Sequence, residues 1–113
     1  MLLLISTIVN SQEVTCSELQ EFIEEKGWND SSLSSYTLES SWLYKVTKYR
    51  YNFKNYIIAE IKTDEYSYTT RTYIFCDIPD YNWSGFKQGY YEDEDSYGKR
   101  FHKYIMDYQC NCN

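Results

Sequence analysis

The sequence has few of the residues that interrupt regular structure, since its 113 residues include one proline and four glycines. Disordered and low-complexity chains are usually rich in such residues, so this composition indicates a folded domain. No apolar run approaches the roughly 20 residues that a membrane-spanning helix needs. The length is typical of one domain, and a domain of this size buries only about two thirds of the surface that its unfolded chain exposes. We therefore expect one domain without a membrane span.

Basic residues are in the minority, with 11 Lys and Arg against 17 Asp and Glu, for a net charge of −6. A nucleic-acid-binding protein usually carries a basic face that replaces counterions on the phosphates. Lys45, Lys48 and Arg50 are the only local basic candidates, on one predicted strand. Nucleic acid is therefore not an expected partner.

The first apolar segment, residues 1–9, is too short to span a bilayer. We interpret residues 1–11 as a signal peptide, because Val9 and Ser11 are small enough for the −3 and −1 positions of a cleavage site. No Lys or Arg precedes the run, which a truncated start would explain. The predicted mature domain is residues 12–113, secreted or periplasmic, where disulfides persist. The alternative reading of this segment is an N-terminal strand or core segment.

A helix is predicted over residues 15–26, because Thr15 and Glu18 have the spacing of a capping box and Gly27 follows as a stop. The polar stretch 29–35 is predicted to be a loop. Three strands are predicted at residues 42–51, 56–62 and 72–78, where β-branched and aromatic residues alternate with polar ones. Pro79 ends the third strand, because proline cannot donate to a ladder.

Two helices are predicted to follow the strands. Asp80 is expected to cap a short helix that Gly89 ends, and Ser96 is expected to cap the last helix. The last helix carries the clearest period in the chain, a stripe of Tyr97, Phe101, Tyr104, Ile105 and Tyr108. The predicted fold class is α+β: a three-stranded antiparallel β-meander covered by an N-terminal helix, a short helix and a C-terminal helix, in two layers.

The spacing of small, aromatic and apolar residues over residues 40–108 resembles the KTSC domain, named for its occurrence at the C-terminus of some lysyl-tRNA synthetases. That family opens a first strand with paired small polar residues. It then ends a strand with Y-x-Y/F-x-x-V/I-P and closes with S-x-G-x-x-F-N-x-x-I. The matching residues here are Ser40, Ser41, Tyr73, Phe75, Ile78, Pro79, Ser96, Gly98, Phe101 and Ile105, and His102 replaces the usual Asn.

More closely, the chain is similar to secreted, Tyr-rich KTSC-like proteins of bacteria. The resemblance implies a fold and no activity. An RNA-related role follows from the synthetase fusions alone, so a nucleic-acid-binding accessory domain is the second alternative function. The helix at 15–26 and the cysteines lie outside the family pattern.

The four cysteines, Cys16, Cys76, Cys110 and Cys112, allow three pairings. A bridge between Cys110 and Cys112 would strain a very small ring. Two pairings remain, and each joins the C-terminal tail to both Cys16 and Cys76. The rival interpretation is a four-thiolate zinc site, but such sites usually show two C-x₂₋₄-C pairs. We predict two disulfides and no metal.

His102 is the only histidine and by itself suggests a general base. Ser96 lies about 240° away around the helix, so the two do not share a face. The alternative function is therefore a small extracytoplasmic hydrolase in which folding brings Asp77, Asp107 or a free cysteine to His102. The bland interpretation is a hydrogen-bonding helix residue, and we predict no catalytic residue.

Two short motifs in the same region are weak. Ser96 and Lys99 form S-x-x-K, but the companion elements of serine acyl-transferases are absent. Asp93, Asp95 and Gly98 fall at positions 1, 3 and 6 of a calcium loop, but position 12 is a tyrosine rather than the bidentate Glu. We predict no cofactor.

Aromatic residues are abundant, with 14 Tyr, 5 Phe and 3 Trp. They cannot all be core residues in so small a domain, and exposed rings bind sugars or proteins. The predicted function is a non-enzymatic binding or interaction module whose partner is a protein or a glycan. The predicted contact surface consists of Tyr81, Trp83, Phe86, Tyr90 and Tyr91.

Overall fold

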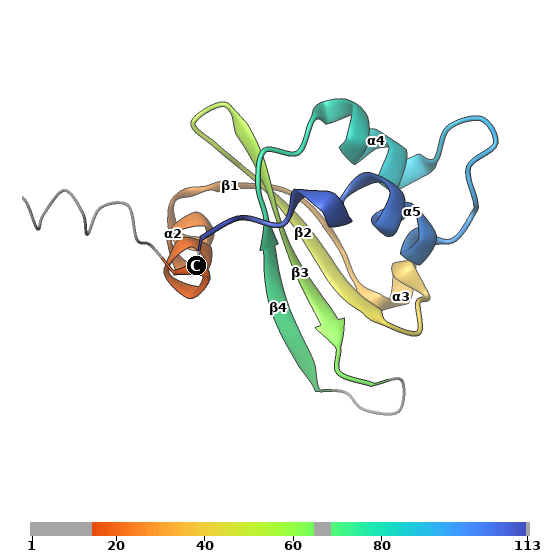
Figure 1. The fold of residues 1–113 in the computed structure, drawn as a ribbon, viewed down its shortest axis with the longest axis horizontal. Helices are drawn as coiled ribbons and strands as arrows, with labels where there is room; N and C mark the ends of the chain where they lie inside the picture. The colour runs from red at the N-terminus through yellow and green to blue at the C-terminus, as the bar shows by residue number, and fades with distance from the viewer. Residues whose placement is uncertain (1–14, 65–68, 113) are drawn as a thin grey trace, which may run out of the picture.

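The computed structural model describes residues 15–64 and 69–112, and these form an α+β fold on a four-stranded antiparallel sheet (Figure 1). The strands lie in the sheet in chain order: β1 (Trp28–Leu33), β2 (Leu43–Tyr51), β3 (Lys54–Lys62) and β4 (Thr70–Phe75). The predicted signal peptide at 1–11 lies outside the described residues.

The predicted number of strands was wrong, because residues 28–33 form the edge strand β1 rather than part of a loop. The strand is polar, since only its last residue, Leu33, packs against the core. An edge strand can be this polar because much of its surface faces water. Polar contacts tie it to β2: the Ser32 and Thr47 hydroxyls lie 3.3 Å apart, and Asp30 Oδ2 accepts from Lys48 Nζ at 2.7 Å.

A two-residue turn joins β2 to β3, with Tyr51 and Lys54 as the last cross-strand pair. Both turn residues have positive φ, 52° at Asn52 and 67° at Phe53. Such turns match the twist of a hairpin, and Asn followed by Gly is the preferred pair. Asn tolerates this conformation well, but a phenylalanine there is unusual.

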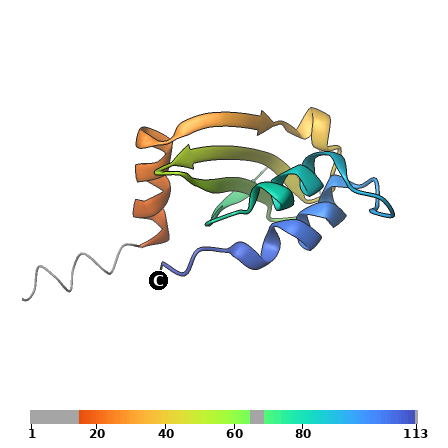
Figure 2. The same ribbon diagram turned by 90° about the horizontal axis from the view of Figure 1, so that it is seen from above.

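One face of the sheet is covered by α4 (Asp80–Gln88) and α5 (Tyr97–Tyr104), which run side by side (Figure 2). The side chains of Ile57 and Ala59, two residues apart in β3, both point toward this face, as predicted from the alternating pattern of the second predicted strand. The aromatic stripe of the last helix also faces the core, as predicted, although α5 ends at Tyr104 and a short 3-10 helix, Met106–Tyr108, carries the stripe on.

The opposite face is covered by α2 (Cys16–Lys26), which stands across one end of the strands (Figure 2). Ile23 packs there against Ile58 and Ile74, which point away from the first core. The helices therefore lie on both faces of the sheet, and the predicted two-layer arrangement was wrong. Gly27 ends α2, and the capping box of Thr15 and Glu18 is present as predicted.

The start of α4 differs from the prediction. Pro79 is the N-cap and Asp80 belongs to the first turn. The Asp80 carboxylate instead accepts a hydrogen bond from Asn55 Nδ2 at 2.7 Å. A short helix between the first two strands, α3 (Ser35–Leu38), was not predicted, and it buries Leu38 in the main core.

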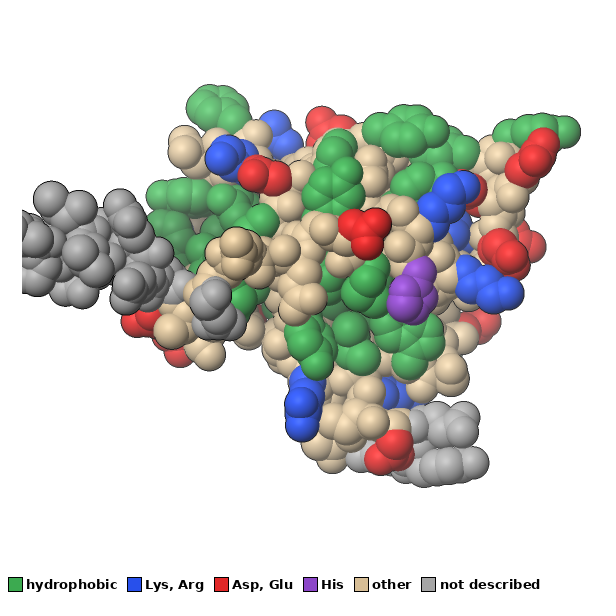
Figure 3. All heavy atoms as spheres, in the orientation of Figure 1, with side chains coloured by type: hydrophobic (Ala, Val, Ile, Leu, Met, Phe, Trp, Pro, Cys, Tyr) green, Lys and Arg blue, Asp and Glu red, His purple; other side chains and the backbone are tan. Residues whose placement is uncertain are grey.

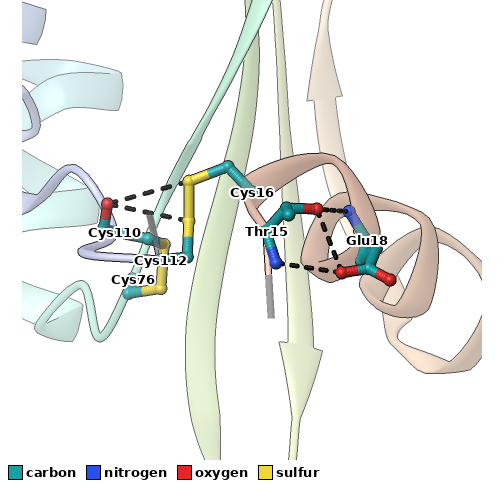
Figure 4. Close-up of a disulfide and its surroundings, with 6 residues drawn as sticks. All are labelled: Thr15, Cys16, Glu18, Cys76, Cys110 and Cys112. Carbon is teal, nitrogen blue, oxygen red and sulfur yellow. Dashed lines mark hydrogen bonds between the residues drawn. A yellow bond between two sulfur atoms is a disulfide. The ribbon is translucent and has the colours of Figure 1, made fainter. Parts of the chain in front are cut away.

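Two disulfides join the C-terminal tail to the body of the domain, as predicted (Figure 4). Cys112 pairs with Cys16 at the start of α2, and Cys110 pairs with Cys76 just after β4. The Cα–Cα distances are 5.1 and 5.0 Å, which are ordinary for a bridge. The tail also adds to the sheet edge, since Cys110 N donates to Ile74 O at 3.1 Å.

No helix within residues 15–64 and 69–112 is long and apolar enough to cross a membrane.

Candidate functional site

The aromatic residues predicted to form a contact surface divide into two groups. Trp83 is 6% exposed and Phe86 is fully buried, so these two are core residues and their assignment to a binding surface was wrong. They lie three residues apart in α4, a spacing that turns both rings toward the sheet. Tyr81 and Tyr91 are exposed, at 64% and 92%, and Tyr90 is half-buried.

The loop after α4 is fixed by internal bonds of the acidic run. The rings of Tyr81 and Tyr90 stack at 4.4 Å, and Tyr90 Oη donates to Tyr81 O at 2.8 Å. Asp93 Oδ2 accepts from Tyr90 N at 2.6 Å and from Tyr104 Oη at 2.5 Å, and Asp93 also pairs with Lys103. The Lys103 contact, together with these two hydrogen bonds, lowers the pKa of Asp93 to about 2. The Asp93 carboxylate thus ties the loop to α5, and we call these contacts the loop latch.

Several residues that carry the family resemblance come together around Trp42. Ser40 Oγ accepts from the backbone N–H of Leu43 at 3.0 Å, where β2 begins. A Cβ at Gly98 would lie 2.7 Å from Trp42 Nε1, so the backbone at this glycine approaches the Trp42 ring closely. The rings of Phe101 and His102 lie 5.8 and 5.0 Å from that of Trp42. This cluster fastens α5 to the start of β2.

His102 is exposed, and no ion pair joins it to a carboxylate of the described residues. Asp77 pairs with Lys54 at 3.9 Å, and all four cysteines are in disulfides. Ser96 Oγ accepts from Lys99 N at 3.2 Å, which is the helix cap that its position predicted. Folding therefore forms no ion pair of Asp77 or Asp107 with His102, and it leaves no free thiol among the described residues for the hydrolase alternative.

Acidic and sulfur ligands also remain apart. Within the described part of the chain, His, Cys, Asp and Glu form no cluster that could hold a metal ion. The acidic run at 92–95 is used internally, by Asp93 as described and by Glu94, which pairs with Lys99 at 3.2 Å.

Two other exposed rings, Trp28 and Phe53, flank a hollow that was not predicted from the sequence. We call it the hairpin groove; it has a volume of about 410 Å³ and is lined by Trp28, Asp30, Arg50, Asn52 and Phe53. Trp28 is 74% exposed and Phe53 is 90% exposed. Trp28 and Arg50 are cross-strand neighbours in β1 and β2, and Phe53 stands in the adjoining turn. A hydrophobic group projects at the upper left of Figure 3, where the β2–β3 turn lies, with polar and basic groups beside it.

Each charged group of the hairpin groove has a partner inside the protein. Asp30 Oδ2 accepts from Lys48 Nζ, and this bond, helped by the charges of Lys87 and Arg50, lowers the pKa of the Asp30 carboxyl. Arg50 Nη1 donates to Asn55 Oδ1 at 2.8 Å and lies 3.9 Å from Asp80 Oδ1.

The buried side-chain amide of Asn55 positions the guanidinium of Arg50. Its Nδ2 donates to Ile78 O at 2.8 Å as well as to Asp80, so it binds the segment before α4 to the hairpin. A second hollow of about 210 Å³ shares Arg50 and Phe53 with the first and extends to Lys54, Asp77 and Asp80. The two hollows therefore adjoin at the hairpin.

The sequence does contain a signal for the groove, in two aromatic residues without apolar neighbours. Trp28 lies between a glycine and a run of polar residues, and Phe53 lies between Asn52 and Lys54 in a predicted turn. A large ring with no apolar neighbour at core spacing is a candidate for exposure.

Comparison with family models, with curated proteins and with solved structures finds no match to this chain. The fold and the groove therefore define the class directly: an α+β domain with a disulfide-tethered tail and an aromatic-flanked groove. The KTSC resemblance stays a prediction.

Proposed function

We propose that this protein is a secreted, non-enzymatic binding module that contacts its ligand through the hairpin groove, with the exposed Tyr81 and Tyr91 as a neighbouring contact surface. Secretion accords with the two disulfides, since such bridges persist in oxidising compartments. The KTSC-like character belongs to this proposal too, on the strength of the residues around Trp42.

The observation that carries the proposal is the exposure of Trp28 and Phe53 on the two sides of one groove. Burying either ring in the core would stabilise the domain by about 1.5–3 kcal/mol, so their exposure has no folding advantage. Aromatic anchors beside a preformed hollow are typical of binding sites.

The conformation of Phe53 adds to this reasoning. A phenylalanine with φ of 67° costs backbone energy that a glycine would avoid. Backbone strain of this kind tends to occur at functional sites. A ring held at this cost and exposed at 90% fits a role in contact with another molecule.

A pull-down from the protein's own secreted and envelope fractions tests the proposal. The oxidised wild-type chain is compared with Trp28→Ser, with Phe53→Ser and with Tyr36→Ser, a control that removes a ring 89% exposed on α3, outside the groove. We expect the groove variants to lose a captured component that the control keeps. Identical capture by all four proteins would refute the groove as the contact surface.

A further inference from the structure

The polar atoms of the hairpin groove indicate the chemical class of its ligand. We infer that the hairpin groove binds a neutral oligosaccharide, with sugar rings lying against Trp28 and Phe53 and hydroxyls bonded to Arg50, Asp30 and Asn52. This inference rests on the proposed function, because it names the ligand class of the same groove.

The balance of charge in the groove disfavours anionic and cationic ligands. Asp30 is offset by Lys48 at 2.7 Å, and Arg50 is offset by Asp80 at 3.9 Å. An anion at Arg50 would meet both carboxylates, and a cation at Asp30 would meet both basic groups. A groove whose charges are paired internally attracts neither sign strongly, so an uncharged ligand is favoured.

Free hydrogen-bonding atoms nevertheless remain in the groove. Among the described residues, Arg50 uses only Nη1 and Asp30 uses only Oδ2. Arg50 Nε and Nη2 are left as donors, Asp30 Oδ1 as an acceptor, and the Asn52 amide as both. A hydroxyl can donate and accept, so a ligand dense in hydroxyls satisfies this mixed set, whereas a polyproline peptide offers only acceptors along its backbone.

The two rings supply the apolar half of the site. A pyranose presents C–H groups on its flat faces, and exposed aromatic rings bury such surface at low cost in side-chain entropy. The groove volume of about 410 Å³ lies in the range of about 300–1,000 Å³ that small-ligand sites occupy. The bond from Arg50 Nη1 to Asn55 Oδ1 positions the guanidinium before the ligand binds.

Calorimetric titration and tryptophan fluorescence test this inference. The probes are an array of neutral oligosaccharides that includes cellohexaose and chitohexaose, with polygalacturonate and decaproline as comparators. We expect saturable binding of at least one neutral oligosaccharide, with a dissociation constant on the order of 1 mM or tighter. The fluorescence of Trp28 is expected to shift, since it is the tryptophan at 74% exposure.

Variants locate the binding on the protein. Trp28→Ala and Phe53→Gly should each weaken binding about tenfold or more, and Asn52→Gly, which suits the positive φ, should weaken it severalfold. Tyr36→Ala should leave it unchanged. Phe53→Gly keeps the turn conformation, so loss of binding there cannot be attributed to misfolding.

The failure of this inference is distinguishable from the failure of the proposed function. No binding to any neutral oligosaccharide, binding only to polygalacturonate or decaproline, or equal loss in Tyr36→Ala overturns the sugar assignment. If the pull-down still depends on Trp28 and Phe53 in that case, the binding module stands with a different ligand. If the pull-down is also insensitive to these rings, both are refuted.

Discussion

Replacement of Phe53 by glycine is predicted to stabilise the protein while it removes a ring from the hairpin groove. A left-handed backbone costs a residue with a side chain about 1–2 kcal/mol, and Phe53 has a φ of 67°. Because the ring is 90% exposed, its loss sacrifices only about 0.2–0.3 kcal/mol of burial. The greater freedom of glycine in the unfolded chain takes back about 0.4–1 kcal/mol. The balance is a gain of about 0.5 kcal/mol for Phe53→Gly.

Phe53→Ala is the matched control, because alanine also lacks the ring but keeps the backbone strain. It should be about 0.3 kcal/mol less stable than the wild type. The assay is urea unfolding of the oxidised proteins, with thermal melts in which Phe53→Gly gains about 2–3 °C. At an ordinary strand position glycine is less stable than alanine by about 0.5–1 kcal/mol, so the order of the two variants should be reversed here. If alanine were the more stable of the two, the strain argument would be refuted.

Three further predictions concern the tail, the helix contact and the loop latch. Replacing Cys16 and Cys112 by serine should lower the free energy of unfolding by about 4.7 kcal/mol in the chain-entropy model, and replacing Cys76 and Cys110 by about 3.8 kcal/mol. The difference arises because the closed loops span separations of 96 and 34 residues. Urea unfolding of both double variants checks this, and a larger loss from the shorter loop would contradict it. Gly98→Ala should destabilise the protein by about 1–3 kcal/mol, because the added Cβ would lie 2.7 Å from Trp42 Nε1, while Lys99→Ala should change stability little. Calorimetric melts of both variants test this, and an unchanged melting temperature for Gly98→Ala would contradict the close contact with Trp42. The pKa of Asp93 is lowered in the folded state to about 2, so this carboxylate contributes stability that is fully present above about pH 4 and is lost as the pH falls through 2. Asp93→Asn should therefore lose less melting temperature than the wild type between pH 5 and pH 2. An identical fall of the melting temperature in both proteins would refute the role of Asp93 in holding the loop.

The sequence was informative where a pattern has one physical cause. Alternation in the second predicted strand placed Ile57 and Ala59 on one face, and the helical period placed Phe101 in the same core, because both patterns record burial directly. The cysteine arithmetic limited the pairings to two, but the choice between them depends on how the tail lies along β4. That placement is a tertiary feature, seen in the bond from Cys110 N to Ile74 O.

The candidate site was the least predictable part of the molecule. Aromatic excess indicates that some rings are exposed, but not which ones, and Trp83 faced the sheet while Trp28 faced the solvent. The groove lies between β1, a polar edge strand without a burial pattern, and a turn that carries an unfavoured residue. Local propensity argues against both elements, so only the paired structure brings Trp28, Arg50 and Phe53 together.

Hydroxyl-radical footprinting of the oxidised protein, with and without material from its own envelope fraction, tests the central claim most directly because it does not depend on knowing the ligand. The account predicts that Trp28 and Phe53 become protected from oxidation while Tyr36, which is 89% exposed, does not. Protection elsewhere with both groove rings still fully reactive would contradict it.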